Sequence, residues 1–257
     1  MMRKDLPVLI EMLSKIDGIE EIAMTTNGFF LKGKARTLYE AGLQRINVSL
    51  DSMNSQKFKE MARRDALKEV LEGLEEVEKV PIRPIKLNCV VIRGYNDDEV
   101  IELAKLAREK PYVVRFLEFM PIGEEDGWSM ERVVPSREIR ERINEWKELR
   151  PIEVERGSTP SEMYTFADGV GKIGFISPVS EPFCAQCDRL RITSDGKLRN
   201  CLFAMEEMDL KSILRKGGKD ELIRDVFLAS VKAKKPGHLI GHKEFVRPEK
   251  TMSQIGG

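Results

Sequence analysis

The chain has 257 residues, of which 41% are hydrophobic, enough to bury a core in one or two domains. Lysine plus arginine and aspartate plus glutamate both number 43, so no overall field favours nucleic acid or a membrane surface. No apolar run reaches the roughly 18 residues of a membrane span, and the start of the chain lacks a signal-peptide pattern. The composition therefore predicts a folded, cytoplasmic protein with neither a membrane nor a nucleic-acid partner.

The first 120 residues alternate helical and strand patterns, which is typical of parallel β/α units. The predicted helices cover 6–16, 34–42, 55–62, 67–79 and 97–109, and the predicted strands cover 20–28, 44–51, 84–92 and 112–120. Apolar residues share one face of the first helix, which we expect to be buried: Val8, Leu9, Met12, Leu13 and Ile16.

The pattern changes after Pro121, where a loop rich in glycine and acidic residues begins. We therefore expect two regions, residues 1–121 with the β/α units and residues 122–257 with an α+β region. The second region is predicted to contain helices over 136–148, 209–217 and 220–233, and short strands near 150–157, 162–167 and 171–176. Its tail, residues 235–257, has no periodic apolar face.

Polar residues follow or end the predicted strands, and in parallel β/α units these ends carry the chemistry. They are Thr25, Thr26, Asn27, Ser49, Asp51, Asn88, Arg115, Glu118 and Met120. Each has an ordinary structural alternative, such as a turn at Asn27, a helix cap at Asp51 with Ser52, or core packing of Met120.

Lys86 is less easily explained, because it lies in an apolar strand between Ile85 and Leu87. A buried ammonium there needs a phosphate or carboxylate partner, and the alternative is a side chain that snorkels outward. We expect Lys86 and Arg115 to point from strand ends toward phosphate.

The four cysteines fall into two classes. Cys89 lies in a β-branched run and is expected to be a small buried side chain. Cys184, Cys187 and Cys201 form a close set that metal explains better than disulfides in a reducing compartment. Asp195–Gly196 lies between the last two and predicts a tight hairpin turn that returns Cys201 toward the others.

Two kinds of metal centre suit three thiolates. A structural zinc ordinarily has four protein ligands and would have to recruit His238, His242 or Cys89. A four-iron cluster held by three cysteines leaves one iron open to a small molecule, and the site would then bind substrate.

Basic residues surround the cysteine set. Arg189 and Arg191 are two residues apart, so on a strand both would point to one face and to the same cavity as the cysteines, where they suit phosphate. The alternative is a salt-bridged surface hairpin, with Lys197 and Arg199 as members.

Several stretches in order resemble the GTP 3',8-cyclase family of molybdenum-cofactor biosynthesis, from about residue 3 to residue 257. These are "TTNG", "INVSLDS", "PIKLNCVVIRGYND", "RFLEFMPIG", the three cysteines with "RLR", and the terminal "IGG". The resemblance implies an α/β fold of partial (β/α) barrel type and a radical S-adenosylmethionine enzyme with two [4Fe-4S] clusters. It implies conversion of GTP to (8S)-3',8-cyclo-7,8-dihydroguanosine 5'-triphosphate, by hydrogen abstraction from the ribose 3' carbon and attack of that carbon on guanine C8.

The resemblance also implies a role for particular residues. Cys184, Cys187 and Cys201 would hold the second cluster, which binds guanine, and Gly256 and Gly257 would reach the active-site cavity. Ser49 and Met120 would contact S-adenosylmethionine. The GTP contacts would be Thr25, Lys86, Arg115, Arg189, Leu190 and Arg191.

The family's C-x3-C-x2-C motif for the first cluster, and its "GGEP"-type strand end, have no counterpart in this sequence. We therefore expect a fragment of a complete enzyme that is inactive by itself. The alternatives are a non-catalytic zinc-stabilised nucleotide-binding module and the auxiliary-cluster domain of another radical enzyme. Further expected partners are an unidentified electron donor, cyclic pyranopterin monophosphate synthase as the next enzyme in the pathway, and a second copy of the chain in a homodimer.

Overall fold

The computed structural model describes residues 3–123, 127–153 and 160–255, which form two compact units. The first, here called the sheet unit, comprises the described parts of 1–118, 133–154 and 161–176. The second, called the cysteine unit, comprises those of 119–132, 155–160 and 177–257. The boundary expected after residue 121 stays a prediction, and the structure adds that 133–154 and 161–176 pack with the sheet unit.

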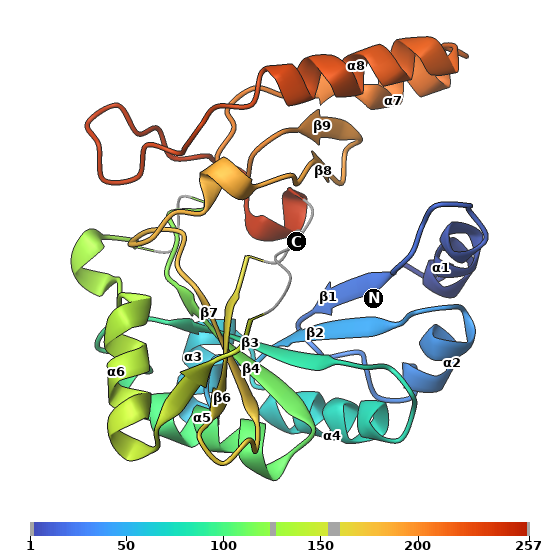
Figure 1. The fold of residues 1–257 in the computed structure, drawn as a ribbon. Helices are drawn as coiled ribbons and strands as arrows, with labels where there is room; N and C mark the ends of the chain where they lie inside the picture. Colours follow the sequence, from blue (N-terminus) through green and yellow to red (C-terminus); the bar gives the residue numbers. More distant parts are fainter. Residues whose placement is uncertain (1–2, 124–126, 154–159, 256–257) are drawn as a thin grey trace. The chain divides into compact units, whose positions relative to one another are not determined.

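A seven-stranded sheet organises the sheet unit, in the order β1-β2-β3-β4-β7-β6-β5 (Figure 1). The pairs from β1 through β4 to β7 are parallel, and β6 and β5 add to β7 in antiparallel fashion. The predicted α/β class with parallel β/α units is confirmed. The strands are β1 (Ala23–Thr26), β2 (Arg45–Ser49), β3 (Ile85–Val91), β4 (Tyr112–Glu118), β5 (Leu149–Pro151), β6 (Glu162–Phe166) and β7 (Lys172–Ile176).

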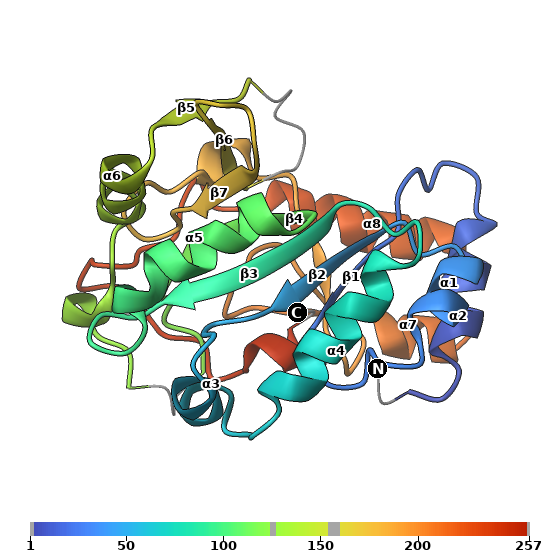
Figure 2. The same cartoon turned by 90° about the horizontal axis from the view of Figure 1, so that it is seen from below.

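Alternation along the strands separates the two faces of this sheet. Ile46 and Val48 of β2 and Leu87 of β3 are buried in the core, where helices α4 and α5 cover one face (Figure 2). The residues between them, such as Asn47 and Lys86, belong to the opposite, polar face. The helices are α1 (Leu6–Ser14), α2 (Ala35–Glu40), α3 (Ser55–Ala62), α4 (Leu67–Glu78), α5 (Val100–Glu109) and α6 (Ser136–Trp146), with a 3₁₀ turn η1 (Asp97–Glu99) before α5.

The face expected to be buried on α1 is wrong. Ile10 is the buried residue of this helix, and Leu6 packs beside it. These two residues lie one helical turn apart, so they face the same side. Of the five residues expected on the buried face, Leu13 is partly buried and the other four are exposed: Val8, Leu9, Met12 and Ile16.

The cysteine unit is built on a small antiparallel sheet in the order β10-β9-β8. Helices α7 and α8 pack against each other and follow this sheet along the chain (Figure 1). The described residues of the tail beyond α8 contain no α-helix. The elements are β8 (Arg191–Ile192), β9 (Lys197–Arg199), β10 (Met208–Asp209), α7 (Leu210–Arg215), α8 (Asp220–Lys232) and the 3₁₀ turns η2 (Met130–Arg132), η3 (Cys184–Gln186) and η4 (Met252–Gln254).

Candidate functional site

A hydrogen-bonded row of side chains crosses the polar face of the sheet. Thr25 and Asn47 are partners in the β1–β2 register, and Asn47 Nδ2 donates to Thr25 Oγ1 at 3.0 Å. Arg115 of β4 donates through Nη2 to Asn47 Oδ1 at 2.9 Å and through Nε to Asn88 Oδ1 at 2.8 Å. Arg115 is only 7% exposed, so its guanidinium is held in one orientation by two amide oxygens.

Lys86 lies on the same face, next to Asn47 in the β2–β3 register. Burial, and after it the charges of Arg115 and Arg45, lower the pKa of Lys86 to about 8, against the attraction of Glu21. Glu21 is itself ion-paired with Arg45 at 2.9 Å. Among the described residues no carboxylate forms an ion pair with Lys86. Two neighbouring cations on this face thus suit an anionic ligand.

Thr25, Lys86 and Arg115 are brought together, but the expectation that they point from strand ends is wrong for Lys86 and Arg115. Lys86 is the second residue of β3, and Arg115 is the fourth residue of β4. The strand register explains this difference, because neighbouring parallel strands begin at different positions along the sheet and the residues that they align lie within the strands. Ser49 does end β2, and Glu118 ends β4, where it accepts a hydrogen bond from the backbone of Ser136 at 2.8 Å.

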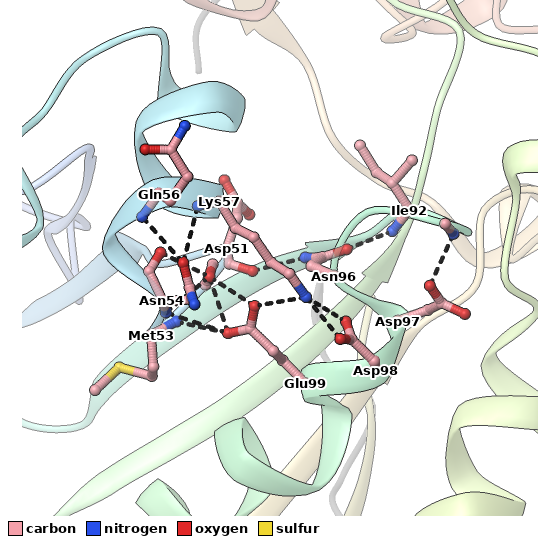
Figure 3. A network of polar contacts seen from close by, with 12 residues as sticks. Asp51, Met53, Asn54, Gln56, Lys57, Ile92, Asn96, Asp97, Asp98 and Glu99 are labelled. Carbon is pink, nitrogen blue, oxygen red and sulfur yellow. Dashed lines mark hydrogen bonds and ion pairs between the residues drawn. The ribbon is translucent and has the colours of Figure 1, made fainter.

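A second polar network lies beyond the end of β2 (Figure 3). Asp51 Oδ1 accepts the backbone N–H of Val90 at 2.9 Å, which extends the β2–β3 ladder by a side chain. Burial raises the pKa of Asp51 to about 6, although this hydrogen bond works in the opposite direction. Asn96 Nδ2 donates to the carbonyls of Asp51 at 2.6 Å and Val90 at 2.9 Å. The loop that follows Ser49 is therefore fastened to β3.

Residues of this network and its surroundings test two expectations, the helix cap at Asp51 with Ser52 and the burial of Cys89. Helix α3 is capped by Asn54, whose Oδ1 accepts from the N–H groups of Gln56 and Lys57, so the cap suggested for Asp51 and Ser52 is wrong. Ser52 instead donates to Glu99, at 2.8 Å to its Oε2. Cys89 is fully buried, as expected for a small core side chain.

In the cysteine unit, Cys184, Cys187 and Cys201 line one cavity of about 220 Å³. The hairpin that returns Cys201 is present, but its turn is Thr193–Gly196, closed by the Gly196 N–H on the Thr193 carbonyl at 2.9 Å. Gly196 has φ of +86°, a conformation that favours glycine. Aromatic and basic side chains complete the wall, among them Phe203, Phe245, His238 and Lys234.

The donors around the three cysteines bear on both predicted metal centres. Within the described ranges, no three His, Cys, Asp or Glu side chains converge on a single-ion position. His238 is engaged on both ring nitrogens, since Nδ1 accepts from the N–H of Ile240 at 3.3 Å and Nε2 donates to the Pro178 carbonyl. A four-iron cluster takes one thiolate at each of three irons, so its ligands surround a volume. The three thiols line one cavity, and both the cluster and the zinc centre stay predictions.

Cations stand close to these sulfurs. Lys234 Nζ lies 3.6 Å from Cys187 Sγ and donates to the Arg189 carbonyl at 2.9 Å. Burial lowers the pKa of Arg191, and the charge of Arg189 does the same, whereas Cys201 and Cys187 raise it. Arg189 packs its guanidinium over Phe183, 5.2 Å from the ring centre.

Two expectations for this segment are not met. Only Arg191 belongs to β8, because the strand begins there, and neither Arg189 nor Arg191 is among the residues that line the cysteine cavity. The alternative of a surface hairpin is also wrong for Arg199, which is only 3% exposed. Leu190, which lies between the two arginines in the sequence, is partly buried.

Three further predicted residues are Met120, Gly256 and Gly257. Met120 is partly buried in the cysteine unit, and its carbonyl accepts the N–H of Ile122 at 3.0 Å. Gly256 and Gly257 lie outside the described residues. Sequence reasoning missed Asn47, although its place between buried Ile46 and Val48 marks it as a residue of the polar face.

Two family models match this chain. Residues 1–107 match the Radical SAM superfamily, and residues 112–240 match Molybdenum Cofactor Synthesis C. The GTP 3',8-cyclase of Thermodesulfovibrio yellowstonii is 42% identical over 258 residues, covering 100% of this chain and 78% of that protein. The GTP 3',8-cyclase of Syntrophomonas wolfei is 41% identical over 257 residues, covering 100% of this chain and 79% of that protein.

The chain belongs to the GTP 3',8-cyclase family. The resemblance in its ordered motifs is thereby confirmed. Membership of the Radical SAM superfamily implies a [4Fe-4S] cluster and S-adenosylmethionine, and the GTP 3',8-cyclase family implies GTP as substrate. Within the described residues, no helix combines the length and the apolar character needed to cross a membrane.

Proposed function

We propose that the chain acts in GTP 3',8-cyclase catalysis, the radical S-adenosylmethionine-dependent cyclisation of GTP that serves molybdenum-cofactor synthesis. The sheet unit would recognise the phosphates of GTP, and the cysteine unit would hold the second cluster. One observation carries this proposal, the Lys86 ammonium beside Arg115 without a carboxylate partner among the described residues.

Charge is the physical reason. Burial, and after it the repulsion of Arg115, lower the pKa of Lys86 to about 8. A triphosphate would compensate both charges and restore the ammonium form. Arg115, already oriented by Asn47 and Asn88, offers a planar fork that matches phosphate oxygens, and the Thr25 hydroxyl extends the same row.

The three cysteines would ligate the auxiliary cluster, which when bound supplies an iron that can take the guanine base. The chain's own residues would prepare that place. Lys234 supplies positive charge beside the Cys187 sulfur, and Phe203 and Phe245 provide aromatic parts of the wall. Ser49, Met120, Arg189, Leu190, Arg191 and the two C-terminal glycines keep the roles proposed from the resemblance.

The phosphate site can be tested by calorimetric binding of GTP and guanosine to Lys86→Met and to the parent chain. Losing a charge-assisted contact costs about 1.5–3 kcal/mol, so the Kd for GTP should rise by roughly tenfold or more, with guanosine unaffected. Lys105→Met on α5 is the matched control, because Lys105 pairs only at the surface with Glu102. Equal GTP affinity of Lys86→Met and the parent would reject the site.

A further inference from the structure

Glu207 lies at the centre of an ion-pair network in the cysteine unit. Its side chain is 12% exposed, and Arg199 contacts it through Nη1 at 3.0 Å. Lys250 contacts it through Nζ at 2.7 Å, and Lys197 approaches to 3.4 Å. Burial works to raise the pKa of Glu207, but the contacts of Lys250, Lys197 and Arg199 hold it below its ordinary value. The Glu207 carboxylate therefore contacts three cations, two of which, Lys197 and Lys250, also pair with Asp195.

On one side this network reaches the loop that begins at Cys201. Arg199 donates through Nη2 to the carbonyls of Leu202, at 3.3 Å, and Ala204. The Ala204 N–H in turn bonds the Cys201 carbonyl at 3.2 Å, and the Phe203 N–H points to the Cys201 sulfur at 3.5 Å. Arg199 thus closes the turn from which the Cys201 thiol projects.

On the other side the network reaches the C-terminal segment. Lys250 also pairs with Asp195 of the hairpin turn at 3.4 Å, and the Ser194 N–H donates to the Gln254 carbonyl at 3.1 Å. Ile255 is fully buried. These contacts dock the segment 248–255 onto the β8–β9 hairpin, whereas the earlier tail residues, such as His238 and Phe245, line the cysteine cavity.

We infer that Glu207 is a positioning residue that couples the C-terminal segment 248–255 to the Cys201 loop, so that neither can loosen without the other. The inference deepens the proposed function. Only the reason for the coupling rests on that function, namely that the cysteine centre and the tail act together. Removing the carboxylate would take from Arg199 the carboxylate with which it pairs, while Arg191 faces it across the β8–β9 pair, and would leave Asp195 as the remaining partner of Lys197 and Lys250. Both ends would then lose the contact that they share, although the Lys250–Asp195 pair and the Arg199 hydrogen bonds to the loop carbonyls do not involve Glu207.

The test is hydrogen exchange with mass spectrometry on the full chain, without cluster or nucleotide, for Glu207→Gln and Lys250→Met. Exchange in 200–206 and in 248–255 should rise about tenfold or more in Glu207→Gln. The control is Glu249→Gln, which removes the same charge from an exposed neighbour of Lys250. Unchanged exchange in 85–91 of the sheet unit would show that the variant is folded.

Lys250→Met distinguishes coupling from two independent contacts. If Glu207 couples the two segments, this change in the tail should also raise exchange in 200–206 and speed alkylation of Cys201 relative to Cys184. An effect confined to 248–255 would overturn the inference, as would a Glu207→Gln variant that loosens neither or only one segment. Should Glu207→Gln fail to fold, Lys250→Met alone decides. Because no GTP is present, failure of the phosphate site in the binding experiment would leave this result untouched.

Discussion

Gly174 of β7 supports the polar face from the neighbouring strand, so Gly174→Ala should disturb both stability and GTP binding. In the β4–β7 register it is the partner of Arg115. A Cβ at this position would lie 3.0 Å from Arg115 Cγ and 3.1 Å from Met163 Sδ, and would collide with Ser161 Oγ. The serine hydroxyl can rotate away, but the Arg115 stem is tied through its guanidinium to Asn47 and Asn88.

The magnitude follows from these contacts. Overpacking costs about 1–3 kcal/mol, and with Ser161 able to move we expect about 1–2 kcal/mol. With a urea m-value of about 2–3 kcal/mol per molar, the unfolding midpoint should fall by roughly 0.5 M. The assay is tryptophan fluorescence in a Trp128→Phe background, because Trp146 of α6 then reports on the sheet unit.

Gly237→Ala in the same background is the control, since nothing lies within 4 Å of its added Cβ. The shift of the Arg115 guanidinium should also weaken GTP binding. An unchanged midpoint with unchanged GTP affinity would refute the claim that Arg115 is held rigidly against β7.

Two further predictions concern charge and metal. Burial raises the pKa of Asp51 to about 6, above the roughly 3.9 of an unfolded chain, so the ionised form costs stability that is fully expressed above pH 6 and disappears below about pH 4. Asp51→Asn should therefore be more stable than the parent by roughly 2 kcal/mol at pH 7.5, with the gap closing near pH 4.5; a gap independent of pH would contradict this. Anaerobic reconstitution should load the chain with iron and sulfide rather than zinc. The Cys201→Ser variant should lose most of that iron, whereas the control Cys89→Ser should keep it. One zinc per chain, by elemental analysis, would favour the nucleotide-binding module.

Local pattern was sufficient for most of the secondary structure. The helix predicted over 55–62 is α3, with the same bounds, and the strand predicted over 84–92 is β3 within one residue at each end. These elements are set by the periodicity of apolar residues and by nearby turn residues, which act within a few positions. The face of α1 was predicted wrongly because the side that meets the core depends on neighbours distant in sequence.

The candidate site divides in the same way. Three cysteines with a hairpin turn between them, and a lysine inside an apolar strand, are unusual enough in the sequence to be recognised from residue type and spacing. That Asn47 would hold Arg115 was not predictable, because 68 positions separate the two residues and only the register of three parallel strands aligns them. The burial of Arg199 between Glu207 and the Cys201 loop also depends on how separate segments fold together.

The sequence by itself determined the order of helices and strands, the cysteine set, the hairpin and the family to which the chain belongs. Tertiary structure decided that β7 pairs with β4, that Lys86 and Arg115 share a polar face inside the sheet, and that Glu207 joins the tail to the Cys201 loop. The physical reason is the distance along the sequence over which each interaction acts. Backbone preference and apolar periodicity act between neighbours, whereas strand register and ion-pair networks join residues dozens of positions apart, and their partners are chosen only when the core packs.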